Sequence, residues 1–253
     1  MPLLEIQDVR RSFYGVHALR GASFGVEAGR ITGLIGPNGA GKTTLFNCVS
    51  GLIPPSSGRI VFEGRDITGE RPDRISCFGL VRTFQIARGF PRLTVLDNLV
   101  LYGRDQPGEG VIPSLLRAPA VRRREEELVA RAVAVASRLD LAKMLCERAA
   151  NLSGGQKKLL EIGRALMASP KLILLDEPVA GVNPTLMREI GVHLRSLIAD
   201  GISLLLIEHQ MDMISSLCDH VVVMAEGKRL TEGSFAELTR DEKVQQAYMG
   251  RRQ

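Results

Sequence analysis

The sequence predicts an α/β fold in which helices cover a mainly parallel sheet. Strand-like and helix-like segments alternate along most of the chain, which favours parallel strands joined by helices. Residues 172–175 and 202–207 are largely apolar runs, typical of strands buried on both faces, and polar residues follow each run. Ligands of open parallel sheets bind at the carboxyl ends of the strands, so we expect the functional residues there.

The first of these segments is a strand, a glycine-rich loop and a helix in succession. Residues 31–35 form a short apolar run, and residues 42–50 have the pattern of a helix that ends at Gly51. The loop between them satisfies the pattern G-x-x-x-x-G-K-[S/T] of phosphate-binding loops in the setting that this pattern requires. The candidate nucleotide-binding residues here are Gly36, Pro37, Asn38, Gly39, Ala40, Gly41, Lys42, Thr43 and Thr44.

Such a loop binds phosphate through its backbone and through two side chains. The glycines let successive N–H groups surround a polyphosphate, and the following helix directs the positive end of its dipole at it. We expect Lys42 to contact the β- and γ-phosphates and the Thr43 hydroxyl to bind Mg²⁺. The alternative, a glycine-rich turn with an accidental lysine, leaves the flanking strand and helix unexplained.

Two carboxylates follow the apolar run at 172–175. Asp176, at the end of a buried strand, is suited to holding Mg²⁺ directly or through water. Glu177 is suited to orienting or deprotonating an attacking water, because phosphoryl transfer requires mainly positioning and charge neutralisation. Alternatively, either carboxylate caps the helix that follows. After a phosphate loop, the catalytic interpretation is the stronger one.

The region from about 94 to 168 differs from the rest, because helical periodicity replaces the strand signals. The apolar residues that recur at helical spacing are Leu128, Ala132, Val135 and Leu139. We interpret this region as a helical subdomain inserted into the sheet domain. Residues 103–120 within it carry several Pro and Gly residues and are predicted to be a surface excursion.

A second glycine motif begins a helix inside this region. Ser153, Gly154, Gly155 and Gln156 precede an apolar helical pattern, and Ser153 with Gln156 matches a capping box. A cap alone leaves two glycines unexplained, since each costs about 1 kcal/mol relative to alanine within a helix. Glycines there let a phosphate approach the N–H groups of the helix N-terminus, which predicts a second phosphate contact.

Size, charge and composition exclude several classes of protein. The 253 residues suit one large unit or two small lobes. The 33 basic and 28 acidic residues give a net charge of +5. This charge is spread along the chain, so we do not expect a surface for nucleic acid. No apolar run approaches the roughly 20 residues of a membrane-spanning helix, and we expect a cytosolic chain without a secretory signal. The scattered cysteines are expected to be buried, reduced thiols, namely Cys48, Cys77, Cys146 and Cys218.

In order along the chain, these motifs resemble the ATP-binding cassette of ABC transporters. The resemblance rests on the phosphate loop, Gln85 after Arg-Thr-Phe, LSGGQ at 152–156, LILLDEP at 172–178 and His209, and it covers essentially the whole chain. It implies a P-loop NTPase (RecA-like) core with a mainly parallel sheet, an N-terminal antiparallel β portion and an inserted α-helical subdomain. It further implies one domain over 1–253, with 1–93 and 169–253 as the core and 94–168 as the helical subdomain.

The resemblance also implies roles for individual residues. Gln85 would sense Mg²⁺ and the attacking water and relay to the membrane partner, and His209 would hold the γ-phosphate. Phe13 would stack on adenine, with Tyr14 as the alternative and a purely structural aromatic as a third interpretation. Asn183 stands where most members have aspartate in the loop that crosses the dimer interface, so the charge of that position is absent here.

Further stretches resemble one subgroup, the importers of branched-chain and related hydrophobic amino acids. They are TLFNCVSG at 44–51, VRTFQ at 81–85, the arginine-rich stretch at 117–127, LLIEHQM at 205–211 and AYMG at 247–250. The cassette of a lipopolysaccharide exporter is a rival that the segment 107–124 and RTFQ disfavour. A non-transport ABC ATPase acting on DNA or the ribosome is a second rival, but it would need coiled coils, zinc hooks or tandem cassettes.

Membership of this subgroup would determine the partners of the chain. In the family, two cassettes dimerise head to tail, and the LSGGQ motif of one completes the ATP site of the other. The resemblance therefore implies a second, different cassette, two transmembrane permease subunits and a separate solute-binding protein. The chain would lie at the cytoplasmic face of the inner (plasma) membrane, attached through the permeases.

Overall fold

The computed structural model describes residues 1–83, 90–104 and 119–249. The chain divides into two compact units, the first made of Met1–Gln85 with Lys171–Gln253 and the second of Ile86–Pro170. The second unit therefore begins before and ends after the limits of 94 and 168 expected for the helical subdomain. Among the helices of the described residues, none has both the length and the apolar character that crossing a bilayer requires.

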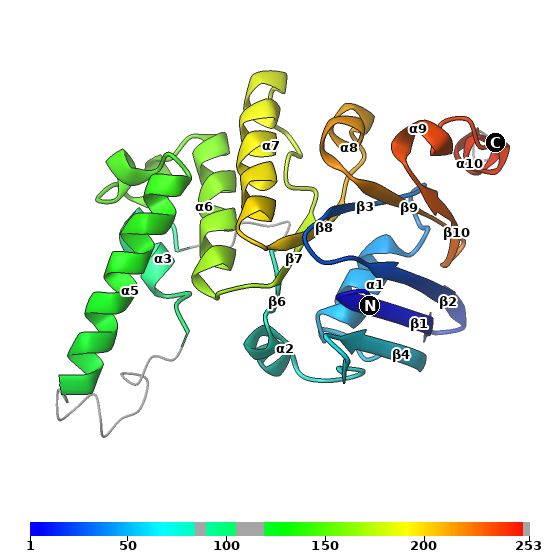
Figure 1. Ribbon diagram of the computed structural model, residues 1–253, viewed down its shortest axis with the longest axis horizontal. Helices are drawn as coiled ribbons and strands as arrows, with labels where there is room; N and C mark the ends of the chain where they lie inside the picture. Colours follow the sequence, from blue (N-terminus) through cyan, green and yellow to red (C-terminus); the bar gives the residue numbers. More distant parts are fainter. Residues whose placement is uncertain (84–89, 105–118, 250–253) are drawn as a thin grey trace. The chain divides into compact units, whose positions relative to one another are not determined.

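A six-stranded sheet forms the centre of the first unit (Figure 1). Its strand order is β10-β9-β3-β8-β7-β6, and every neighbouring pair is parallel except β9 and β10. The predicted mainly parallel sheet is thus confirmed, with the apolar runs as its central strands. The strands are β3 (Ile31–Ile35), β6 (Leu80–Arg82), β7 (Leu172–Asp176), β8 (Ser203–Ile207), β9 (His220–Ala225) and β10 (Lys228–Gly233).

A second sheet of the same unit is antiparallel, as expected for the N-terminal β portion. Its order is β2-β1-β4-β5. Tyr14 and Gly15 both have positive φ and form the tight turn between the first two strands. The strands are β1 (Leu4–Phe13), β2 (Val16–Val26), β4 (Ser57–Phe62) and β5 (Arg65–Asp66).

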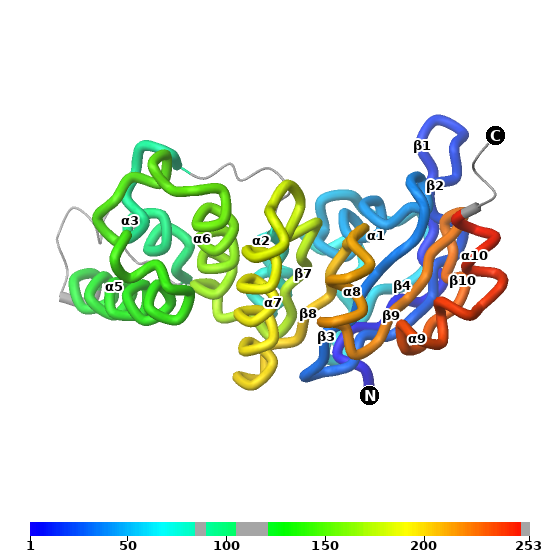
Figure 2. Tube along the Cα trace, turned by 90° about the horizontal axis from the view of Figure 1, so that it is seen from above, coloured from blue at the N-terminus to red at the C-terminus, as the bar shows by residue number. Residues whose placement is uncertain are grey.

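Helices cover both faces of the parallel sheet. α7 and α8 lie on one face and α1 on the other, where α1 packs against the antiparallel strands (Figure 1). α9 and α10 lie beside β10 (Figure 2). The helices of this unit are α1 (Lys42–Val49), α2 (Pro72–Phe78), α7 (Pro184–Ala199), α8 (Met211–Leu217), α9 (Phe235–Leu238) and α10 (Glu242–Met249).

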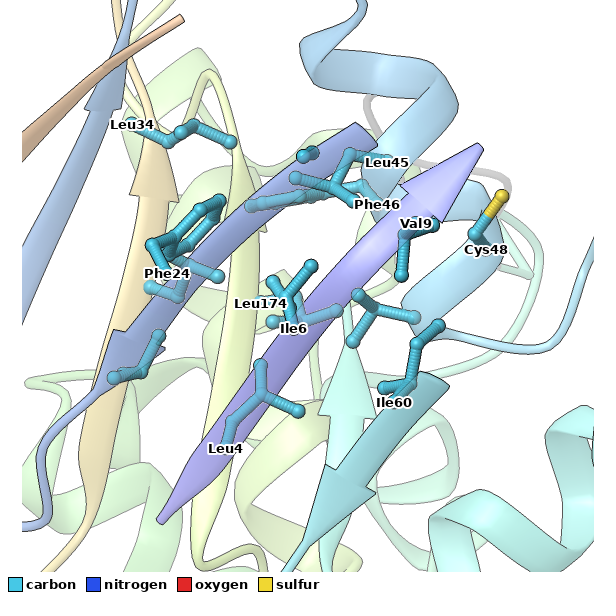
Figure 3. Packing of buried hydrophobic residues seen from close by; sticks show 14 of the residues in the cluster. Leu4, Ile6, Val9, Phe24, Leu34, Leu45, Phe46, Cys48, Ile60 and Leu174 are labelled. Carbon is cyan, nitrogen blue, oxygen red and sulfur yellow. The ribbon is translucent and has the colours of Figure 1, made fainter. Parts of the chain in front are cut away.

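One buried apolar cluster joins the two sheets through α1. Phe46 of α1 is buried together with Ile6 and Phe24 of the antiparallel sheet and with Leu34 and Leu174 of the parallel one (Figure 3). Burying an aromatic or aliphatic side chain of this size contributes about 1.5–3 kcal/mol. The first helix after the phosphate loop is therefore anchored from two sides.

The described residues of the second unit are helical, without a multi-residue strand. They contain α3 (Val95–Val100), α5 (Pro119–Arg138) and α6 (Gly154–Met167), with short 3-10 turns at Ala142–Met144 and Ala149–Asn151. A buried hydrogen bond of 2.6 Å from Arg164 to Asn98 joins α6 to α3. Because α5 begins at Pro119, the predicted excursion at 103–120 ends earlier than expected, and its residues 105–118 lie outside the described residues.

The cysteines only partly follow the prediction of buried thiols. Cys48 is buried and Cys218 is half-buried, whereas Cys77 and Cys146 are exposed. The prediction is wrong for the exposed pair because the spacing of cysteines excludes a disulfide framework without reporting on burial. Burial raises the pKa of Cys48 to about 11 and that of Cys218 to about 12, so both are neutral thiols at physiological pH.

Candidate functional site

The polar residues that follow β3, β7 and β8 meet around one pocket of about 630 Å³ in the first unit. Lys42 enters it from the start of α1, Glu177 from the end of β7 and His209 from the end of β8. These strands are neighbours in the sheet, so their carboxyl ends converge as expected for a parallel fold. The remaining lining residues are Val16, His17, Ala18, Arg20, Asn38, Gly39, Ala40, Gly41, Thr43, Thr44, Ile207 and Glu226.

Two glycines of the phosphate loop are required by close backbone contacts. Gly36 has φ of +148°, and a Cβ there would lie 2.1 Å from the carbonyl oxygen of Met224. Gly41 has φ of +96°, and its Cβ would lie 2.6 Å from the carbonyl oxygen of Ala18. No side chain fits at either distance, so the loop can follow this path only with glycine.

The loop is also held from outside by the turn between β9 and β10. The N–H of Gly227 donates to the carbonyl oxygen of Ala40 at 3.0 Å, and its own carbonyl accepts the N–H of Arg20 at 2.8 Å. Glu226 and Gly227 both have positive φ, as in a tight hairpin turn. This turn thus links the phosphate loop to the antiparallel sheet. Sequence reasoning missed it, although Glu-Gly between two strand-like runs is a weak hairpin signal.

The start of α1 has the geometry of an anion site. Gly41 is the N-cap and supplies no side-chain hydrogen bond, so the N–H groups of the first turn are not occupied by a cap. Lys42 is 6% exposed, and its Nζ donates to the carbonyl oxygens of Gly36 at 2.7 Å and Pro37 at 3.1 Å. These bonds draw the ammonium into the loop, where it adds positive charge to the helix dipole.

Glu177 and His209 lie next to each other in the lining of the pocket. The Nε2 atom of His209 lies 3.3 Å from Oε1 of Glu177, and both side chains are partly exposed. Glu177 has a left-handed backbone with φ of +50°, and its N–H donates to the carbonyl oxygen of Ile207 at 3.0 Å. A partly exposed carboxylate held beside an imidazole is suited to orienting a water molecule and accepting its proton.

Asp176 lies deeper than the pocket wall and is paired with Arg82. The salt bridge is 2.9 Å long, and the side chains of Arg82 and Asp176 are 8% and 4% exposed. The guanidinium also donates to Asn47 at 2.6 Å and to Ser50 at 3.3 Å. Mg²⁺ in such sites takes one or two protein oxygens beside phosphate and water. Thr43, which lines the pocket, and the carboxylate of Asp176 at the end of β7 are residue types that fit this ion.

The aromatic residues chosen for adenine do not line the pocket. Phe13 is half-buried, and the guanidinium carbon of Arg11 lies 4.8 Å from its ring centroid. Tyr14 is fully exposed at the tip of its turn. The start of β2 lines the pocket instead, through Val16 and His17, which no sequence motif singled out. Their position follows from the register of the hairpin, which pairs Phe13 with Val16.

The LSGGQ turn lies in the second unit and has a complete capping box. The N–H of Ser153 donates to Oε1 of Gln156 at 2.9 Å, and the N–H of Gln156 donates to the Ser153 hydroxyl at 3.3 Å. A Cβ at Gly154 would meet no atom within 4 Å, so the described chain itself does not require glycine there. Gly155 is buried in the first turn of α6.

Two further predicted positions have different outcomes. Gln85 lies outside the described residues. Asn183 is the N-cap of α7, and its side-chain oxygen accepts the N–H of Leu186 at 2.9 Å, ahead of Pro184 in the first turn. Asparagine and aspartate cap helices about equally well, so Asn183 can cap α7 as an aspartate would, but without a negative charge.

Residues 19–180 match the ABC transporter family, and the chain therefore belongs to that family of ATP-hydrolysing cassettes. It is 41% identical over 250 residues to the probable branched-chain amino acid transport ATP-binding protein LivG of Archaeoglobus fulgidus, covering 99% of this chain and 96% of that protein. It is 35% identical over 254 residues to the high-affinity branched-chain amino acid transport ATP-binding protein LivG of Escherichia coli, covering 98% of each. The crystal structure of a nucleotide-free ATP-binding cassette from an ABC transporter has a TM-score of 0.86 at 39% identity and covers 99% of this chain and 100% of its own.

Proposed function

We propose that this chain is the ATP-binding and ATP-hydrolysing subunit that energises import of branched-chain (Leu, Ile, Val) or related hydrophobic amino acids. The observation that carries the proposal is the pocket in which Lys42, Glu177 and His209 converge on the uncapped start of α1. The names of the two LivG relatives support the substrate class. The transported amino acid would contact other subunits, and this chain would supply the energy.

In the proposed reaction, the phosphate loop binds the triphosphate and two side chains act at the γ-phosphate. The N–H groups of α1 and the ammonium of Lys42 neutralise the phosphates. Glu177 orients the attacking water and accepts its proton, while His209 donates a hydrogen bond to the γ-phosphate. Thr43 and Asp176 would hold Mg²⁺, which would supply positive charge to the phosphate oxygens.

We propose that the LSGGQ turn completes the ATP site of a second cassette. The open space at Gly154 supports this, because a phosphate from another chain could approach the N–H groups there. The ATP pocket, within the described residues, is lined by the first unit alone. In a head-to-tail dimer, Ser153, Gly154, Gly155 and Gln156 would supply the missing contacts to the γ-phosphate.

The proposed complex contains a different second cassette, two permeases and a solute-binding protein, with this chain at the cytoplasmic face of the inner membrane. ATP bound between the cassettes would hold them together, and closure would switch the permeases between inward and outward access. Gln85 would relay the state of the site to the permeases. Hydrolysis would remove the γ-phosphate bridge and let the cassettes separate, as in other nucleotide switches.

The replacement Glu177→Gln tests the chemical step. It removes the proton acceptor and keeps the shape of the side chain, so kcat for ATP hydrolysis should fall by about 10²- to 10⁴-fold. ATP affinity, measured by fluorescence titration, should stay near the wild-type value because Lys42 and the loop are untouched. In cells that lack the native gene, the variant should fail to restore uptake of labelled leucine.

The matched control is Glu27→Gln, which removes one carboxylate from an exposed turn of the same unit. It should hydrolyse ATP and support uptake like the wild type. Wild-type hydrolysis by Glu177→Gln would remove Glu177 from its proposed role. Unchanged leucine uptake in cells without the gene would contradict the proposed substrate class.

A further inference from the structure

Glu208 is a buried acidic residue that none of the roles above uses. It follows β8 directly, and only 2% of its surface is exposed. One carboxylate oxygen accepts the N–H of Val179 at 3.1 Å, and the other accepts the N–H of His209 at 3.1 Å. A single carboxylate therefore joins the loop that follows β7 to the loop that follows β8.

The loop that follows β7 needs this support because of the backbone of Glu177. Its φ of +50° lies in the left-handed region, which residues with a Cβ adopt only when their surroundings hold them there. The carbonyl of Ile207 holds the N–H of Glu177 at 3.0 Å, and the Glu208 carboxylate holds the N–H of Val179 two residues later. The end of β8 thus fixes the turn on both sides of Pro178.

A carboxylate is the side chain that meets this geometry. Two backbone N–H groups from different loops are met here by two acceptor oxygens, whereas the amide of glutamine offers one acceptor oxygen and an NH₂ group that can only donate. Burial raises the pKa of Glu208, and the backbone N–H groups of Val179, His209 and Gln210 oppose that shift. The carboxylate is therefore costly to bury and is supported by the donors that it organises.

We infer that Glu208 is a positioning residue for ATP hydrolysis, whose carboxylate keeps the Glu177 turn and the His209 loop in one arrangement. The two side chains lie 3.3 Å apart, and both depend on backbone segments that Glu208 binds. The phosphate loop is held separately, by Gly227. Glu208 should therefore affect kcat and leave nucleotide binding alone. The inference rests on the proposed function of Glu177.

The test is Glu208→Gln in the full-length chain, with Asp212→Asn as the control. Asp212 is an exposed carboxylate in the first turn of α8, so its loss changes the charge near the site without touching the two loops. Glu208→Gln should lower kcat about 10- to 100-fold, because small displacements of a reacting group have effects of that size. KM and ATP affinity should stay near wild type. Hydrogen exchange should become faster only in the segments around 177–183 and 208–210.

Each other outcome overturns the inference. A wild-type kcat, or a lower kcat with unchanged exchange in those segments, shows that the carboxylate does not position Glu177. Equal losses of kcat and ATP affinity with faster exchange throughout show a general structural role. If Glu208→Gln does not fold, hydrogen exchange of the wild-type protein tests the inference, because rapidly exchanging amides at Val179 and His209 would contradict the two hydrogen bonds.

The variant Glu177→Gln, measured in parallel, separates the two proposals. A fully active Glu177→Gln removes the proposed role of Glu177. An inactive Glu177→Gln beside a fully active Glu208→Gln removes only the role of Glu208.

Discussion

Two helices of this chain have a glycine at their start, α1 as its N-cap and α6 as its first residue, but the N–H groups of their first turns are capped differently. α1 follows Gly41, which has a left-handed backbone and no side chain to cap the helix. α6 follows Ser153, whose hydroxyl accepts the N–H of Gln156 while the Gln156 side chain returns to the N–H of Ser153. The start of α1 lines a pocket and carries a buried lysine, whereas the start of α6 is exposed at Ser153 and Gly154.

The difference separates two reasons for glycine at a helix start. At Gly41 the chain itself requires glycine, because a Cβ would lie 2.6 Å from the carbonyl oxygen of Ala18. At Gly154 a Cβ would meet nothing within 4 Å, so the reason for glycine must be sought outside the described chain. The start of α1 therefore lies in a phosphate-binding pocket that its own unit forms, while the start of α6 has a stable cap beside an open approach to its backbone.

The largest effect is expected for Lys42→Ala at the α1 start. Loss of the ammonium removes a charge-assisted contact to phosphate, and such contacts are worth roughly 1.5–3 kcal/mol or more, so ATP affinity should fall about 100-fold. Equilibrium titration with a fluorescent ATP analogue on the purified single chain measures this. An unchanged affinity would show that the α1 start is not the phosphate site.

The replacement of glycine by alanine at each helix start sharpens the comparison. Gly41→Ala places an alanine in a left-handed conformation and brings its Cβ against the backbone, so it should lower the free energy of unfolding by about 2 kcal/mol and weaken nucleotide binding. Gly154→Ala should be neutral or stabilise the fold by up to about 1 kcal/mol. Denaturant unfolding of the two variants gives both values. Equal destabilisation would erase the proposed difference between the two positions.

The smallest effect is expected for Gly154→Leu in the assembled transporter. The side chain would cover the N–H groups of α6, so hydrolysis that depends on a second cassette should fall about tenfold, the effect of losing one phosphate hydrogen bond. ATP affinity of the single chain should not change. Gly191→Leu on α7 is the matched control, since a Cβ there also meets nothing within 4 Å. Full hydrolysis by assembled Gly154→Leu would contradict the role proposed for the LSGGQ turn.

Much of the fold could be predicted because each of its central strands is a short apolar run in the sequence. Residues 31–35 are β3 as predicted, and the runs that end near Asp176 and Ile207 are β7 and β8. The family resemblance added the antiparallel portion, which no periodicity had indicated. Local sequence carries these features because a strand buried on both faces has few polar positions.

The finer parts of the site could not be predicted, because they depend on residues brought together by the sheet. Arg82 and Asp176 are 94 positions apart, and the parallel pairing of β6 with β7 makes them neighbours. His17 reaches the pocket through the hairpin register, and the left-handed Glu177 depends on backbone contacts with Ile207. None of these contacts has a local sequence signal.

The hairpin turn that braces the phosphate loop has a consequence for how the protein could be divided. The family match ends at residue 180, yet the carbonyl of Met224 and the backbone of Gly227 shape the loop near residues 36–41. A fragment that ends at residue 180 would thus lack the backbone atoms of Met224 and Gly227 that contact its nucleotide loop. During synthesis, the loop can make these contacts only after residues 224–227 have been added to the chain.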